Sequence, residues 1–107
     1  HFATGNPALL PLLGRVDCEA VSVDWRAPLD EAWEAIGDRA IQGNLDPAVC
    51  LAPWPVVEAR ALDVLRRAGR RPGHVFNLGH GVLPDTEADL LARLAALVGE
   101  RTAAVPA

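Results

Sequence analysis

The sequence of 107 residues contains no methionine and no lysine, so all ten of its basic residues are arginines. Acidic residues outnumber them and give a formal net charge of −4 at pH 7, which argues against a nucleic-acid-binding protein. Because a chain without methionine that begins with His1 lacks a start residue, we expect it to be a piece of a longer protein.

Cysteine is scarce, and long hydrophobic runs are missing. The two cysteines, Cys18 and Cys50, lie far apart, in neither a CxxC nor a Cys/His spacing. This pattern predicts two buried, reduced thiols in a cytoplasmic protein and no metal site. No apolar stretch reaches the roughly 20 residues that span a bilayer, and no signal peptide is visible, so we expect no membrane association.

Half of the residues are hydrophobic, enough for a packed core, and their patterning predicts strands that alternate with helices. The expected strands are 20–25, 39–44 and 74–78. The first expected helix runs from Pro28 to about Gly37, and the second follows the loop "NLDPAV" and ends at Gly69. A third is expected over 87–99, and a further short helix within 7–15. Residues 100–107 are expected to form a loose tail.

Each of the two longer helices is predicted to bury one stripe. The stripe of the first consists of Val57, Ala61, Val64, Leu65 and Ala68. The second helix should begin at a capping box formed by Thr86 and Asp89, end at Gly99, and bury Leu90, Leu91, Leu94, Leu97 and Val98.

Alternating strands and helices predict an α/β fold with βα units and a parallel sheet. Three such units would leave strand edges exposed at both sides of the sheet, whereas a (β/α)8 TIM barrel closes its sheet and needs roughly 250 residues. We therefore expect residues 1–107 to be a single partial domain, the C-terminal part of such a barrel, which begins with a truncated strand before the short helix.

Polar residues stand at the C-terminal end of every expected strand, where barrel enzymes place their active sites. They are Asp24 after the first strand, Gln42, Asn44 and Asp46 around the second, and Asn77 and His80 after the third. Their convergence at one end predicts a ligand site. The arginine-rich run 66–71 and His74 fall at the opposite end, where a structural role is expected.

Three stretches together resemble the C-terminal part of the uroporphyrinogen decarboxylase family: "SVDWRAPLDEAW", "AIQGNLDPAVCLAP" and "RRPGHVFNLGHGVLPDT". The resemblance implies a (β/α)8 barrel, a homodimer and a cofactor-independent enzyme of porphyrin and heme biosynthesis. Enzymes of this family convert the four acetate side chains of uroporphyrinogen III to methyl groups, giving coproporphyrinogen III and carbon dioxide. The tetrapyrrole substrate is thus the implied partner.

The resemblance also implies roles for the loop after the third strand. The family counterpart of His80 lines the substrate cleft, where an imidazole could bind a carboxylate or assist proton transfer. Gly79 and Gly81 would let the backbone approach a bulky ligand. Asn77 and Gly79 are secondary substrate-binding candidates. The catalytic Asp and carboxylate-binding Arg residues of the family come from its N-terminal part, so we expect this chain alone to be inactive.

Most of the other polar residues have structural alternatives. Asn77 could tie its loop to the neighbouring strand, and Asp85 suits a turn or a helix start. Asn44 and Asp46 could order a turn before Pro47 or line the cleft. For Asp24 we expect a hydrogen bond to a neighbouring loop at the barrel mouth.

Two other functions compete. Zinc- and cobamide-dependent methyltransferases share the fold, but they hold zinc through an HxC motif and a later Cys, where this chain has Ala3 and His80. A non-enzymatic βα module that oligomerises would suit the short length, although it would not need polar strand ends.

Overall fold

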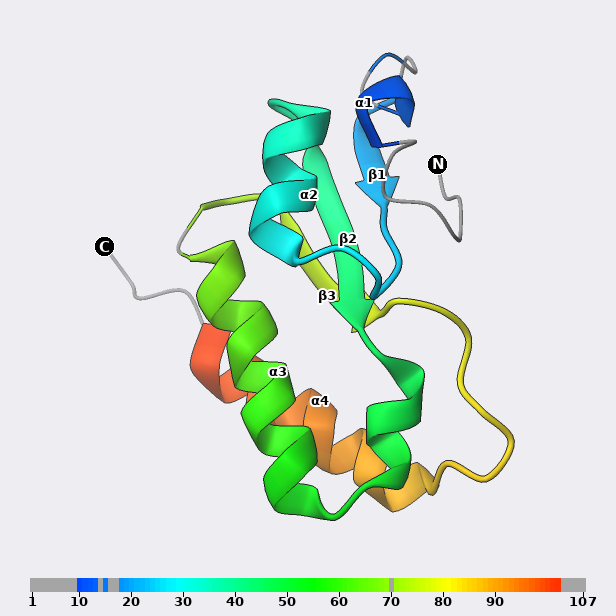
Figure 1. Ribbon diagram of the computed structural model, residues 1–107. Helices are drawn as coiled ribbons and strands as arrows, with labels where there is room; N and C mark the ends of the chain where they lie inside the picture. Colours follow the sequence, from blue (N-terminus) through cyan, green and yellow to red (C-terminus); the bar gives the residue numbers. More distant parts are fainter. Residues whose placement is uncertain (1–9, 14, 16–17, 70, 103–107) are drawn as a thin grey trace.

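The structure, a computed structural model, describes residues 10–13, 15, 18–69 and 71–102. Helices and strands alternate along this part of the chain (Figure 1). The elements are α1 (Leu10–Leu13), β1 (Ala20–Ser22), α2 (Leu29–Ile36), β2 (Ala40–Leu45), the 3-10 helix η2 (Pro47–Leu51), α3 (Trp54–Ala68), β3 (His74–Leu78) and α4 (Ala88–Thr102).

The three strands form one parallel sheet in the order β1-β2-β3, with β2 in the centre. In this register Ile41 lies between Val21 and His74, and Leu45 lies opposite Leu78. All strand arrows in Figure 1 therefore point to the same end of the sheet, which we call the carboxyl edge. This arrangement confirms the predicted fold class, three βα units with parallel strands as in part of a (β/α)8 barrel.

The two faces of the sheet differ in what covers them. Val21 and Ile41 are fully buried beneath the helices, together with Leu29 of α2 and Val57 and Ala61 of α3. Successive residues of a strand point to opposite faces. The row Ser22, Gln42, Val75 therefore lies on the other face, where Ser22 and Gln42 are half-buried and Val75 is 52% exposed.

Helices α2 and α3 agree with their predictions. The first is bounded by Pro28 and Gly37, and its first turn carries Asp30 and Glu31. The second ends at Gly69, whose positive φ of 64° suits glycine and whose N–H caps the carbonyls of the last turn. The predicted stripe of α3 is buried at four positions and half-buried at Leu65.

Two loops differ from expectation. The first strand stops at Ser22 rather than residue 25, because Asp24 bends the chain by accepting a hydrogen bond from the backbone N–H of Arg26. The expected loop "NLDPAV" instead contains η2, whose first turn is capped by the Asp46 carboxylate through the Ala48 N–H at 2.9 Å. The second strand is displaced by one residue, to Ala40–Leu45.

The last helix differs most from its prediction. Gly99 does not end α4, which continues to Thr102, so residues 100–102 are helical and not part of a loose tail. The burial of Leu94 and Leu97 outweighs the roughly 1 kcal/mol that a helical glycine costs. The predicted capping box is also wrong, since the buried Thr86 hydroxyl has no hydrogen-bond partner within the described residues.

The chain ends were predicted only in part. Helix α1 falls within the short helix expected over 7–15. The truncated first strand and the tail residues 103–107 lie outside the described residues. Within the described part, no helix is long and apolar enough to cross a membrane.

Both cysteines are free thiols. Cys50 is buried as predicted, whereas Cys18 is only half-buried. Burial, and secondarily the charge of Asp46, raises the pKa of the Cys50 thiol, so this group stays protonated at neutral pH.

Candidate functional site

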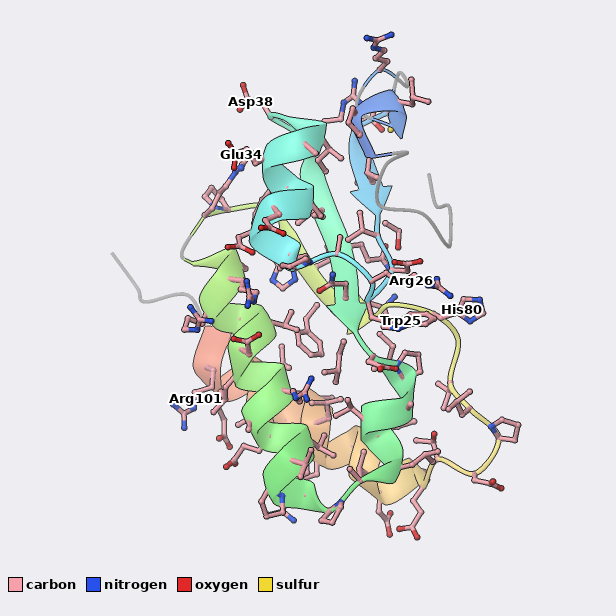
Figure 2. The ribbon with its side chains drawn as sticks, in the orientation of Figure 1. Trp25, Arg26, Glu34, Asp38, His80 and Arg101 are labelled. Carbon is pink, nitrogen blue, oxygen red and sulfur yellow. The ribbon has the colours of Figure 1, made fainter. Side chains whose placement is uncertain are left out.

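Three loops meet at the carboxyl edge of the sheet. Residues 23–28 join β1 to α2, Asp46 leads from β2 into η2, and residues 79–87 join β3 to α4 (Figure 2). The backbone N–H of Gly79 donates to the Leu45 carbonyl at 2.7 Å, so the third loop leaves the sheet beside the end of β2. The polar strand ends predicted to converge therefore do share one edge.

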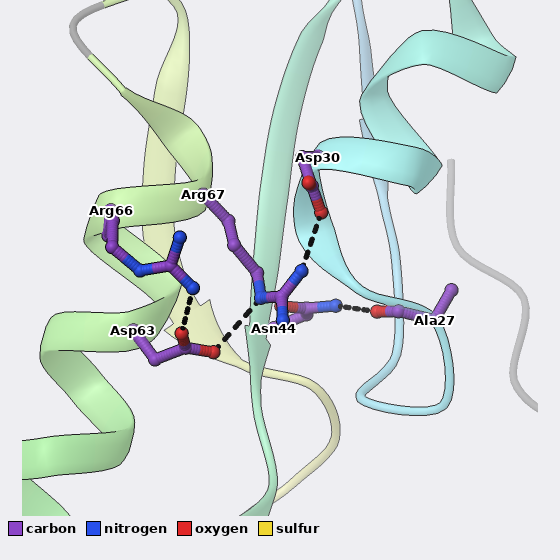
Figure 3. A network of polar contacts seen from close by, with 6 residues as sticks. All are labelled: Ala27, Asp30, Asn44, Asp63, Arg66 and Arg67. Atoms are coloured by element: carbon purple, nitrogen blue, oxygen red, sulfur yellow. Dashed lines mark hydrogen bonds and ion pairs between the residues drawn. The ribbon is translucent and has the colours of Figure 1, made fainter.

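Asn44 fixes the first of these loops to the central strand. Its amide Nδ2 is buried and donates to the carbonyls of Asp24 at 2.9 Å and Ala27 at 2.6 Å; the latter bond is drawn in Figure 3. The expectation that Asn44 orders a turn before Pro47 is therefore wrong, because its hydrogen bonds go to the neighbouring loop. The turn role belongs to Asp46 alone.

The loop between β1 and α2 is also braced from within. The Asp24 carboxylate, 8% exposed, accepts hydrogen bonds from the backbone N–H of Arg26 at 2.9 Å and from its Nη1 at 2.7 Å. The second contact is an ion pair. These bonds and the Asn44 amide together hold residues 24–27 in one conformation.

Gly79 lies where two loops touch backbone to backbone. A Cβ at this position would stand 2.5 Å from the Trp25 nitrogen and 2.9 Å from the Asp24 carbonyl carbon. The close approach that we expected toward a ligand is thus made by the chain itself. A Cβ at Gly81, in contrast, would meet nothing within 4 Å.

His80 follows directly and stands beside a tryptophan. The His80 and Trp25 rings have centroids 6.3 Å apart at an interplanar angle of 86°, an edge-to-face contact. The guanidinium of Arg26 lies 4.3 Å from the Trp25 ring centroid on its face. All three side chains gather at the carboxyl edge in Figure 2, where His80 is exposed and Trp25 half-buried.

Sequence reasoning singled out His80 and missed Trp25 and Arg26. Both belong to the stretch "SVDWRAPLDEAW" and directly follow Asp24, a predicted strand-end residue. Their position directly after a predicted strand could have identified them from the sequence. The contact between Trp25 and His80 could not be predicted, because it depends on how closely two loops pass at Gly79.

The remaining predicted site residues are Asn77, Asp85 and Gln42. Asn77 is exposed and its Oδ1 accepts from the next backbone N–H, that of Leu78, so the predicted tie to the neighbouring strand is not formed. Asp85 is exposed in the turn before α4, as predicted. Gln42 is half-buried on β2. Ligand contacts by His80, Asn77 and Gly79 stay predictions.

A cleft of about 160 Å³ opens between α3 and the loop after β1, and His80 is not among its lining residues. Arg67 closes one side of it, with Nη1 3.0 Å from an Asp30 oxygen and Nε 3.0 Å from an Asp63 oxygen (Figure 3). Hydrogen bonds from Arg66 and then Arg67 lower the pKa of Asp63, and that from Arg67 lowers the pKa of Asp30. The pair of Arg67 with Asp30 joins α3 to α2, whereas the pairs with Asp63 lie within α3.

The opposite end of the sheet, the amino edge, carries the other predicted structural residues. The ring of His74 pairs through Nε2 with the Gly43 carbonyl at 2.9 Å and lies against Trp33. Arg71 donates to the Gly37 carbonyl at 2.9 Å. Protein groups thus occupy His74 and the described arginines of the run 66–71, which agrees with the structural role predicted for them.

In the described ranges, no group of three or more His, Cys, Asp or Glu side chains could hold a metal ion. The zinc alternative rested partly on His1 and Ala3, which lie outside these ranges.

The sequence model of the family described as "Uroporphyrinogen decarboxylase (URO-D)" matches residues 1–101. The chain is 52% identical over 104 residues to a uroporphyrinogen decarboxylase of Salinispora tropica, covering 96% of this chain and 28% of that protein. The uroporphyrinogen decarboxylase of Thermobifida fusca is 53% identical, over 96% of this chain and 29% of that protein. The one of Roseiflexus sp. is 47% identical, over 96% of this chain and 30% of that protein.

The chain thus spans less than a third of the length of these curated relatives. The match covers the loops of the carboxyl edge and the helices that support them. With its parallel βα units and its strand-end polar residues, the chain belongs to the uroporphyrinogen decarboxylase family.

Proposed function

We propose that this chain supplies the last βα units of a uroporphyrinogen decarboxylase. The enzyme would convert uroporphyrinogen III to coproporphyrinogen III and carbon dioxide, without a cofactor, in heme biosynthesis. The observation that carries the proposal is the identity of about half of all residues to proteins of that name, over 96% of the chain.

The arrangement of the carboxyl edge supports the proposal. Each decarboxylation breaks the bond between an acetate methylene and its carboxylate, and one proton must reach the methylene carbon. An exposed imidazole at a strand end can bind a substrate carboxylate or take part in this proton transfer, and His80 stands at such a place. We therefore assign His80 to the substrate cleft, with Asn77 and Gly79 as secondary contacts.

The chain would act only within a complete barrel. A substrate with eight carboxylates needs a strongly basic pocket, whereas this chain has a net charge of −4 and its described arginines largely contact the protein itself. We expect residues 1–107 to form one partial domain of a cytoplasmic homodimer, with the remaining carboxylate-binding residues supplied by preceding strands. The chain alone should not form coproporphyrinogen.

A segment exchange tests the proposal. In the Salinispora tropica enzyme, the 104-residue matching segment is replaced by this chain to give a chimera, and uroporphyrinogen III is supplied anaerobically. We expect coproporphyrinogen, detected by chromatography after oxidation to the porphyrin. A folded chimera that leaves uroporphyrinogen unchanged, while the parent enzyme converts it, would contradict the proposal. The chain assayed alone is the matched control.

A further inference from the structure

His80 stands at the start of an exposed loop. Residues 80–85 are all exposed, and the loop extends away from the body of the molecule in Figure 1. A binding group must be held to within a fraction of an ångström to contribute fully. A contact at the carboxyl edge that restricts the imidazole would therefore favour its binding role.

Trp25 is placed to provide that contact. It approaches the imidazole in the edge-to-face geometry that aromatic pairs favour, at a centroid distance of 6.3 Å. Unlike the other two tryptophans, Trp25 belongs neither to the buried core nor to the side chains packed against it. Core packing therefore does not account for a large aromatic residue at this position.

The loop that carries Trp25 is itself immobilised on the central strand. Asn44 donates to the carbonyls on either side of it, those of Asp24 and Ala27. The Asp24 carboxylate holds Arg26, whose guanidinium covers one face of the indole. These contacts fix the loop that presents the indole to the imidazole.

We propose that Trp25 is a positioning residue for His80: the indole, held by Asn44 and by the Asp24–Arg26 pair, orients the imidazole toward the substrate. The proposal rests on the proposed function only for its consequence in catalysis. The contact itself is a property of this chain. Gly79 makes the contact possible, because any side chain there would separate the two loops.

A double-mutant cycle in the chimera tests the inference. Trp25→Leu should lower kcat/KM about tenfold, the size expected for an aromatic pair at the upper end of its range. Trp25→Phe should restore it to within about threefold, because a phenyl ring keeps the edge-to-face contact. In a His80→Asn background, Trp25→Leu should lower kcat/KM no further than about twofold, because the residue acts through the imidazole.

Trp54→Leu is the matched control, because Arg93 covers Trp54 at 4.2 Å in the same way, but no histidine ring lies against Trp54 within the described residues. Its effect on kcat/KM should be the same with His80 or Asn at position 80. If Trp25→Leu and His80→Asn were likewise independent, or Trp25→Phe were as impaired as Trp25→Leu, the inference would be wrong.

A spectroscopic measurement separates this inference from the proposed function. In chimera labelled with carbon-13 histidine, the His80 ring signal is identified by its loss in His80→Asn. Ring current from the indole should displace this signal, and Trp25→Leu, but not Trp54→Leu, should move it toward the position of a free histidine. An inactive chimera that shows this shift would contradict the proposed function alone. An unmoved signal would contradict the positioning role, whatever the activity.

Discussion

Among the residues that the structure describes, tryptophan, arginine and histidine come together twice, once at each edge of the sheet. At the carboxyl edge Arg26 lies 4.3 Å from the Trp25 centroid, and His80 lies 6.3 Å from it. At the amino edge Arg71 lies 4.2 Å from the Trp33 centroid, and His74 lies 6.3 Å from it. We call these the carboxyl trio and the amino trio.

The two trios differ in burial and in their hydrogen bonds. In the amino trio Trp33 is 2% exposed, its Nε1 donates to the Arg39 carbonyl at 2.8 Å, and the His74 ring is engaged by Gly43. In the carboxyl trio Trp25 is half-buried and His80 is exposed. The same three residue types thus pack the interior at one edge and present an accessible imidazole at the other. The burial around each trio, rather than its residue types, decides the role of its residues.

The largest effects are expected when each tryptophan is truncated in the chimera. Trp33→Ala should lower the free energy of unfolding by about 3–5 kcal/mol, because it empties a buried site, while leaving kcat/KM of the folded fraction unchanged. Trp25→Ala should show the opposite pattern, with about 1 kcal/mol lost in stability and a clear loss in kcat/KM. Urea denaturation and steady-state kinetics measure both. Equal stability losses would remove the distinction between the trios.

A second test concerns the glycine that brings His80 to Trp25. Gly79→Ala would place a Cβ 2.5 Å from the Trp25 nitrogen, so the backbone must shift, at a cost of about 1–3 kcal/mol. Activity should fall with it, because the loops separate. Gly81→Ala is the control and should change stability by less than about 0.5 kcal/mol. If Gly79→Ala changed neither the free energy of unfolding nor the activity, the loops would not need to touch.

The third test removes the Asn44 amide, which holds the loop of Trp25 to the central strand; we call this contact the Asn44 clamp. Asn44→Ala leaves the Asp24 and Ala27 carbonyls without this donor, at a cost of about 1–3 kcal/mol. We also expect the His80 ring signal to broaden or move, as in Trp25→Leu. Asn77→Ala, at an exposed position of the neighbouring strand, should cost no more than about 0.5 kcal/mol in thermal unfolding. Equal losses at the two positions would count against the clamp.

The smallest effect is expected for the two ion pairs of Arg67, with Asp30 of α2 and with Asp63 of its own helix α3. Arg67→Gln removes the partner that lowers the pKa of Asp30 and helps to lower that of Asp63. A lowered carboxyl pKa stabilises the fold above the ordinary value of 3.8, and this stabilisation is lost as the pH falls through the lowered value. The variant should therefore have a slightly lower Tm than the parent at neutral pH, with no difference in strong acid. A pH-independent difference would assign the effect to packing instead.

Much of the fold could be predicted because local signals agree with the tertiary structure. The strand His74–Leu78 was predicted at its observed bounds, since its apolar run lies between Gly73 and Gly79. Proline and glycine likewise bounded α2. At Gly99 the local signal failed, because the packing of Leu94 and Leu97 overrides the preference of one glycine.

The site was predictable at the level of strand ends but not of contacts. Order along the chain placed Asp24, Asn44 and His80 at one edge, because parallel strands end together. The partners of Asn44 lie 17 and 20 residues away, and Trp25 meets His80 from 55 positions earlier in the chain. Such contacts depend on loop conformation, which hydrophobic periodicity does not encode.

The bonds made by the end of β2 also bear on how members of the family could exchange segments. Asn44 holds the preceding loop and Leu45 holds the following one, so neighbouring loops depend on matched sequences at this edge. The turns at the amino edge, around Gly37 and Gly69, are linked by an exposed contact in which Arg71 donates to the Gly37 carbonyl at 2.9 Å, whereas the bonds of Asn44 are buried. Recombination between homologous genes should therefore yield working proteins more often when crossovers fall at these helix-to-strand turns.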